Sequence, residues 1–153
     1  MLFLPTSVSS AFLALLSSQH GAGDREGFRR LFKSSLIFSL GSVIPASALL
    51  ICLPESAMAL FGEGFRRGWL TLVILAGSSS FVVLNNVLGQ VLVSTGHVWL
   101  RSALDVCLAI VFLLLAISFV PQFEQNGLAL AHLGSYMIVA SMLLVAVRPR
   151  LRG

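Results

Sequence analysis

The stretch WLTLVILAGSSSFVVLNNVLGQVLV, residues 69–93, contains no charged side chain. A helix needs about 20 mostly apolar residues to cross the hydrocarbon core of a bilayer. Lipid cannot hydrogen-bond to backbone N–H and C=O groups, so a spanning segment forms either a helix or a strand of a closed barrel. These residues do not alternate with the two-residue period of a barrel strand. The stretch therefore predicts a transmembrane helix.

Four further apolar stretches surround this one, and they predict helices at about 2–18, 31–53, 98–120 and 128–147. The chain is 57% hydrophobic and only 10% charged, whereas a soluble domain carries about 25% charged residues. The stretch 2–18 has an alternative interpretation as a signal peptide, but no Lys or Arg precedes it and no A-x-A pattern follows it. The sequence thus predicts an all-α membrane protein: one transmembrane domain (1–153) of about five helices, with a short basic tail at 148–153.

Positive charges gather at alternate ends of the expected helices. The segment 25–33, Arg101 and the tail hold all the Lys and Arg residues except Arg66 and Arg67. The positive-inside rule then places the N-terminus outside and the C-terminus in the cytoplasm. Membrane topology also accounts for the net charge of +4, so we expect no nucleic-acid partner. The first expected helix has almost no segment before it. An outside N-terminus is expected for such a helix when other helices precede it in a longer chain.

A strip of polar side chains follows one face of the helix expected at 69–93. Ser79, Asn86, Gln90 and Ser94 succeed one another at spacings of seven, four and four residues, which places them on the same face. Polar side chains within a span avoid lipid and face a partner helix or a wet cavity. The strip has two interpretations, the lining of a transport path or hydrogen bonding between helices.

Two other polar groups have similar alternatives. His97, Arg101 and Asp105 recur every four residues, and Arg101 is a candidate for contact with a phosphate. The alternative is that Arg101 reaches the headgroups and neutralises Asp105 one turn away. His132 and Tyr136 share a helical face, and this pair could relay protons or simply pack.

The motifs of catalysis are missing from the sequence. It contains no Gly-rich phosphate loop, no GxSxG, no HExxH and no paired carboxylates within a span. We therefore expect no catalytic residues, no metal site and no cofactor, and the protein is not expected to be an enzyme. A membrane-embedded enzyme stays the least supported alternative.

Three segments resemble polysaccharide (O-antigen) flippases of the multidrug/oligosaccharidyl-lipid/polysaccharide exporter superfamily. FLPTSVSSAFLALLSSQHGAGDREGFRRLF (3–32) looks like the eighth helix of these transporters and the cytoplasmic loop after it. ALFGEGFRRGW (59–69) resembles the connection after the next helix, and NNVLGQVLVSTGHVWLR (85–101) resembles a helix that ends in Gln, a small residue, Thr-Gly and a polar residue. The resemblance covers nearly the whole chain, in order.

The resemblance implies that the chain is most of one lobe, helices eight to twelve, of a transporter with twelve to fourteen helices. It implies transport of a polyprenyl-diphosphate-linked oligosaccharide across the bacterial cytoplasmic (inner) membrane, for polysaccharide or lipopolysaccharide synthesis. Ser79, Asn86, Gln90 and Arg101 are then the candidate substrate-cavity residues. The expected partners are membrane lipids, the lipid-linked oligosaccharide, and the missing N-terminal lobe or a second copy of the chain.

Other functions stay open at this point. A multidrug exporter or a peptidoglycan-precursor exporter of the same superfamily would share these motifs, and the charge of the cavity would distinguish them. A small membrane scaffold or subunit that transports nothing is the alternative from a different class.

Overall fold

The computed structural model describes residues 25–54, 56 and 68–152. These ranges form three helices, which are α2 (Arg25–Cys52), α4 (Trp69–Ser94) and α5 (Val98–Arg152). α5 bends sharply at Glu124, and its two halves contain the separate apolar segments Val98–Glu124 and Asn126–Arg148. The described part of the chain thus has four helical segments long and apolar enough to cross a membrane, and it contains no strand.

These helices confirm the predicted all-α membrane fold. The expected helix at 2–18 and the connection that holds Arg66 and Arg67 lie outside the described residues. The expected helix at 31–53 begins earlier, at Arg25, because its charged first turns can extend beyond the hydrocarbon while Phe28 stays buried. α5 continues through Arg152 instead of ending at 147.

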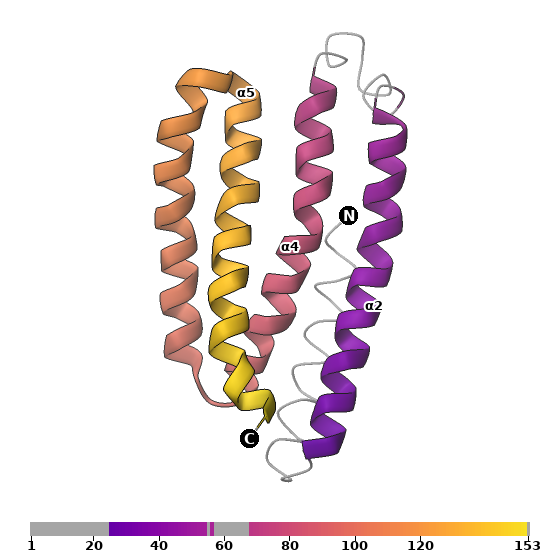
Figure 1. The fold of residues 1–153 in the computed structure, drawn as a ribbon, viewed down its shortest axis with the longest axis vertical. Helices are drawn as coiled ribbons and strands as arrows, with labels where there is room; N and C mark the ends of the chain where they lie inside the picture. The colour runs from indigo at the N-terminus through magenta and orange to yellow at the C-terminus, as the bar shows by residue number, and fades with distance from the viewer. Residues whose placement is uncertain (1–24, 55, 57–67, 153) are drawn as a thin grey trace.

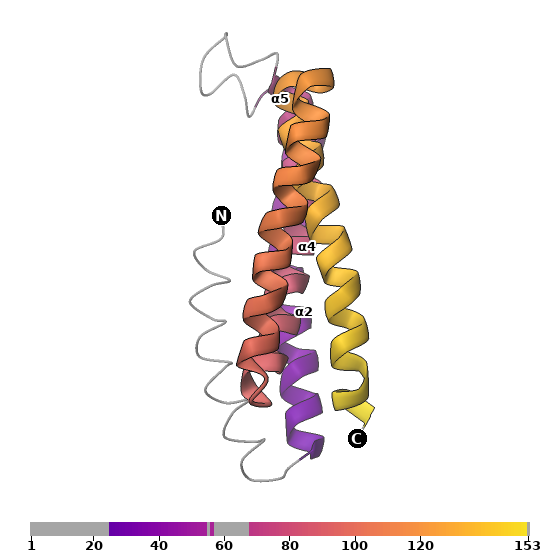
Figure 2. The same ribbon diagram turned by 90° about the vertical axis from the view of Figure 1, so that its left-hand side faces the viewer.

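The four segments run up and down in alternation (Figure 1). The beginning of α2, the end of α4 and both ends of α5 lie at one end of the bundle, which we call the basic end because Arg29, Arg30, Lys33, Arg101 and Arg148 belong to these helix ends. α4 crosses the bundle obliquely from α2 towards the first half of α5. Figure 2 gives the view in which α5 lies in front of α4 and α2.

α4 is the central helix of the described part. In the most apolar 18-residue stretch of α4, 44% of the residues are buried. In the corresponding stretch of the first half of α5, only 6% are buried. Val43 of α2 packs with Val83 and Val87 of α4 in one apolar cluster. A second cluster, near the basic end, joins all three helices and comprises Phe28, Leu88, Val91, Leu92, Leu104, Val139, Leu143 and Val147.

Glycine permits the two turns at either end of the first half of α5. α4 ends in a left-handed residue, Gly96 (φ +79°), and the His97 N–H donates to the Leu92 carbonyl at 2.8 Å, as in a Schellman motif. At the bend, Glu124 has φ 51°. A Cβ on Gly127 would lie 2.8 Å from the Val120 nitrogen and closer still to the Phe119 carbonyl, so only glycine lets the two halves of α5 meet this closely.

Candidate functional site

Three polar side chains of α4 point toward α5 at intervals of seven residues. The Thr71 hydroxyl donates to Oδ1 of Asn126 at 2.7 Å, and the Ser78 hydroxyl lies 3.2 Å from Nδ1 of His132. Asn85 accepts from Arg101. Seven residues turn an α-helix through almost two full turns, so these three positions form a stripe along one face. We call Thr71, Ser78 and Asn85 the α5-facing stripe.

Arg101 is held by α4 at the basic end of this stripe. Its Nη1 donates to both the backbone carbonyl and Oδ1 of Asn85, at 3.1 and 3.0 Å. Its Nη2 lies 2.8 Å from Oδ1 of Asp105, which confirms the predicted pairing of these two residues. The guanidinium lies against Gly89, where a Cβ would be 2.9 Å from Nε and 2.5 Å from Cζ. Arg101 is therefore a contact between α4 and α5, with its side chain only 18% exposed.

His132 occupies the middle of the same interface. The Ser78 hydroxyl lies 2.8 Å from the Leu75 carbonyl and 3.2 Å from Nδ1 of His132, and the tautomer of the imidazole decides which atom donates in the second contact. The imidazole packs edge-on against Phe112, with ring centres 6.4 Å apart, and against Tyr136 at 4.7 Å. The surroundings are those of a histidine packed between helices by one hydrogen bond and two rings.

The predicted cavity strip lies beside the α5-facing stripe. Ser79 and Asn86 each follow a member of that stripe by one residue, or about 100° around the helix. Ser79 and Ser94 donate to carbonyls of their own helix, at 3.1 Å each. Asn86 and Gln90 are half-buried, and the buried Oε1 of Gln90 has no hydrogen-bond partner among the described residues.

The four candidate residues therefore divide between two faces of α4. Ser79, Asn86 and Gln90 share one face, while Arg101 meets the neighbouring face through Asn85. The sequence interpretation overlooked Asn85, together with Thr71 and Ser78. Their period of seven residues was a signal that could have found them. The lining of a cavity by Ser79, Asn86, Gln90 and Arg101 stays a prediction.

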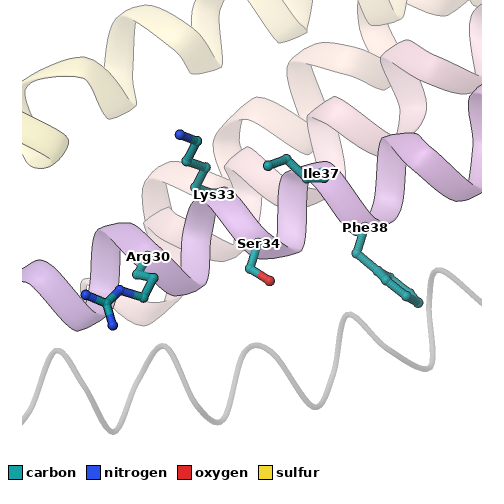
Figure 3. A pocket seen from close by; sticks show the side chains of 5 residues that line it. All are labelled: Arg30, Lys33, Ser34, Ile37 and Phe38. Carbon is teal, nitrogen blue, oxygen red and sulfur yellow. The ribbon is translucent and has the colours of Figure 1, made fainter.

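A hollow of about 390 Å³ lies along α2 near the basic end. The lining side chains form two rows along α2 (Figure 3). One row consists of Arg30, Ser34 and Phe38, and the adjacent row consists of Lys33 and Ile37. The positive charges lie nearer the helix start and the apolar side chains lie deeper along the span. The described lining of this open hollow comes from α2 alone and combines positive charge with apolar side chains.

The described residues contain no group of three or more His, Cys, Asp or Glu side chains that could hold a metal ion. No match to the chain was found among curated proteins or among solved structures. The family model of the lipid II flippase MurJ does match, over residues 2–153. With four apolar spans in its described part and this match over nearly its whole length, the chain is a multi-pass membrane protein that belongs to the lipid II flippase MurJ family, within the same exporter superfamily that the motifs indicate.

Proposed function

We propose that the chain is part of a transporter that flips lipid II, the lipid-linked precursor of peptidoglycan, across the bacterial cytoplasmic membrane. The observation that carries the proposal is the match of the lipid II flippase family over residues 2–153. This match favours the peptidoglycan-precursor alternative over export of an O-antigen or another polysaccharide. The proposed process is transport without covalent chemistry.

The proposed mechanism is alternating access, in which two lobes rock about a cavity near the bilayer midplane. The described helices are assigned to one lobe. We place the basic end in the cytoplasm, because positive residues concentrate on that side of membrane proteins. The N-terminus is then outside and the C-terminus inside. Basic side chains at this end would meet the phosphates of the lipid, and polar side chains along α4 would meet the sugars.

Asn86 and Gln90 are the proposed cavity residues of this chain. Both are half-buried and neither belongs to the face of α4 that is hydrogen-bonded to α5. The unpaired Oε1 of Gln90 supports the proposal, since a ligand hydroxyl would satisfy it; Nδ2 of Asn85 and Oγ of Ser35 are unpaired among the described residues as well. The face also contains Ser79, whose hydroxyl is already bonded to Leu75.

The test is a flipping assay with the full transporter in proteoliposomes, in which a labelled lipid II becomes accessible to an external reagent. Asn86→Leu combined with Gln90→Leu is expected to lower the flipping rate at least tenfold, the loss of about 1.4 kcal/mol. The control is Ser118→Leu combined with Ser141→Leu, because both hydroxyls are exposed and bond only to their own helix.

Equal rates for the two double variants would remove Asn86 and Gln90 from the cavity. A wild-type protein that flips a lipid-linked polysaccharide unit but leaves lipid II in place would contradict the proposed substrate itself. The two results are separate, so failure of the site does not imply failure of the function.

A further inference from the structure

A groove of about 440 Å³ lies where α2, α4 and the second half of α5 meet near the basic end. This volume lies in the lower part of the range of ligand sites, which occupy about 300–1,000 Å³. Its lining comes from all three helices and consists of Phe32, Leu36, Leu84, Leu88, Leu144, Val145, Val147 and Arg148.

The chemistry of the lining restricts what can occupy the groove. Apart from Arg148, every lining side chain is a hydrocarbon, so the groove presents no hydroxyl, amide or carboxyl side chain to a sugar or a peptide. Arg148 contributes one positive charge. The groove therefore fits a hydrocarbon chain with a negative group at one end.

The position of Arg148 along its helix identifies the source of such a molecule. It is the last residue of the apolar segment Asn126–Arg148, so its charge lies where the hydrocarbon layer ends and the lipid phosphates begin. Leu144 and Val145 precede it by about one helical turn, toward the bilayer interior. The groove and its charge are thus aligned with an acyl chain and the phosphate above it.

The groove differs from the smooth lipid-facing surface of a helix. Its deepest side chains, Leu88 and Val147, are 2% and 1% exposed and belong to the apolar cluster that joins the three helices. Its rim includes Val145, which is 74% exposed. An acyl chain in this position contacts three helices at once, whereas a lipid beside the first half of α5 contacts one.

We propose that this groove binds one bilayer phospholipid with an anionic headgroup, its acyl chain between Phe32, Leu84 and Leu144 and its phosphate on Arg148. Juxtamembrane basic residues attract anionic lipids, by about 1 kcal/mol for each Lys or Arg. The occupant is a bilayer lipid and not the transported substrate, because the lining offers nothing to a sugar and the volume suits one short chain. The proposal is independent of the proposed function.

Native mass spectrometry of the full chain in detergent tests the proposal, with phosphatidylglycerol and phosphatidylcholine titrated separately. Arg148→Gln is expected to weaken binding of phosphatidylglycerol about fivefold and to weaken binding of phosphatidylcholine less, because the choline cation of that lipid offsets the charge of its phosphate. Its matched control is Arg29→Gln, which removes an exposed charge from the same end of the bundle but outside the groove.

A second pair of variants tests the apolar part. Val145→Trp fills the groove from its rim and is expected to weaken binding of both lipids, while Met142→Trp, an exposed position outside the groove, is expected to bind both as the wild type does. The proposal is wrong if Arg148→Gln and Arg29→Gln lower phosphatidylglycerol binding equally, or if Val145→Trp binds both lipids as tightly as Met142→Trp. Either result would mean that lipids surround the helices without a specific site.

Discussion

Replacing Gly89 by alanine should destabilise the protein although alanine is the better helix former. Gly89 lies inside α4, and its missing side chain makes room for the guanidinium of Arg101. A methyl group at this position would lie 2.5 Å from Cζ of Arg101, which is far inside van der Waals contact. The guanidinium must therefore shift when Gly89→Ala is made, and we expect this shift to break its bonds to Asn85.

The balance of two effects sets the expected magnitude. Alanine in place of glycine stabilises a helix interior by about 1 kcal/mol. Against this stands the loss of the contact between Arg101 and Asn85. Both of its bonds come from the same nitrogen, Nη1, so we count them as one charge-assisted contact of about 2 kcal/mol. The pair with Asp105 adds little, because that carboxylate is 46% exposed and such pairs contribute about 0–1 kcal/mol. Gly89→Ala should thus lower the free energy of unfolding by about 1 kcal/mol.

The effect of the same substitution should reverse once Arg101 is removed. Arg101→Ala alone should cost about 2 kcal/mol, and in that background Gly89→Ala should stabilise by about 1 kcal/mol. Reversible unfolding in mixed micelles of SDS and a mild detergent, followed by tryptophan fluorescence, measures all four proteins of the cycle. Gly77→Ala is the matched control, since a Cβ at Gly77 of the same helix meets nothing within 4 Å.

A Gly89→Ala protein as stable as the Gly77→Ala protein would contradict the contact between Gly89 and Arg101. A second refuting result is strict additivity of Gly89→Ala and Arg101→Ala. Either outcome would mean that the guanidinium does not rest on Gly89, and Arg101 would again be available to a ligand.

Three further substitutions test the contacts within and beside α5. Gly127→Ala forces a methyl group onto the Phe119 backbone and should cost about 1–3 kcal/mol in the same unfolding assay. Gly134→Ala should cost much less, because its Cβ would meet only the flexible end of Leu115 at 3.2 Å, and equal losses would contradict the tight turn. Ser78→Ala leaves Nδ1 of His132 without its partner and should cost about 0.6 kcal/mol, the average for hydrogen bonds between membrane helices. A loss above about 2 kcal/mol would show that His132 does more than pack.

The fold class could be predicted from the sequence because it depends on local composition. Long runs without charge leave only one structure that lipid tolerates, and all four described segments follow from such runs. Helix bounds could not be predicted in the same way. Arg25 to Arg30 look like a loop when only hydropathy is considered, but water and headgroups allow the helix to continue past the hydrocarbon, with Phe28 packed in the cluster near the basic end.

The partners of the polar residues could not be predicted, because neighbouring positions give equally regular stripes. Asn85 and Asn86 are adjacent in sequence and point about 100° apart. Both Thr71-Ser78-Asn85 and Ser79-Asn86-Gln90 have helical spacing, and only the position of α5 decides which one is paired. The bond between Arg101 and Asn85 joins two helices, so no spacing within one helix predicts it. Arg101 and Asp105 lie four residues apart in the same helix, and this spacing was enough to predict their pairing.

Because Arg101 is already bonded to Asn85 and Asp105, other basic residues are better candidates for contact with a phosphate. A phosphate at Arg101 would compete with two hydrogen bonds to Asn85 and an ion pair to Asp105. Drawing the guanidinium away from Asn85 would leave Oδ1 of a side chain that is 1% exposed without its donor. Arg30 and Lys33 face no such competition from the other described residues, and both line a hollow at the same end of the bundle. An anionic lipid headgroup that approaches the basic end therefore meets these two side chains at lower cost than Arg101, which is better explained as the residue that fastens α5 to α4.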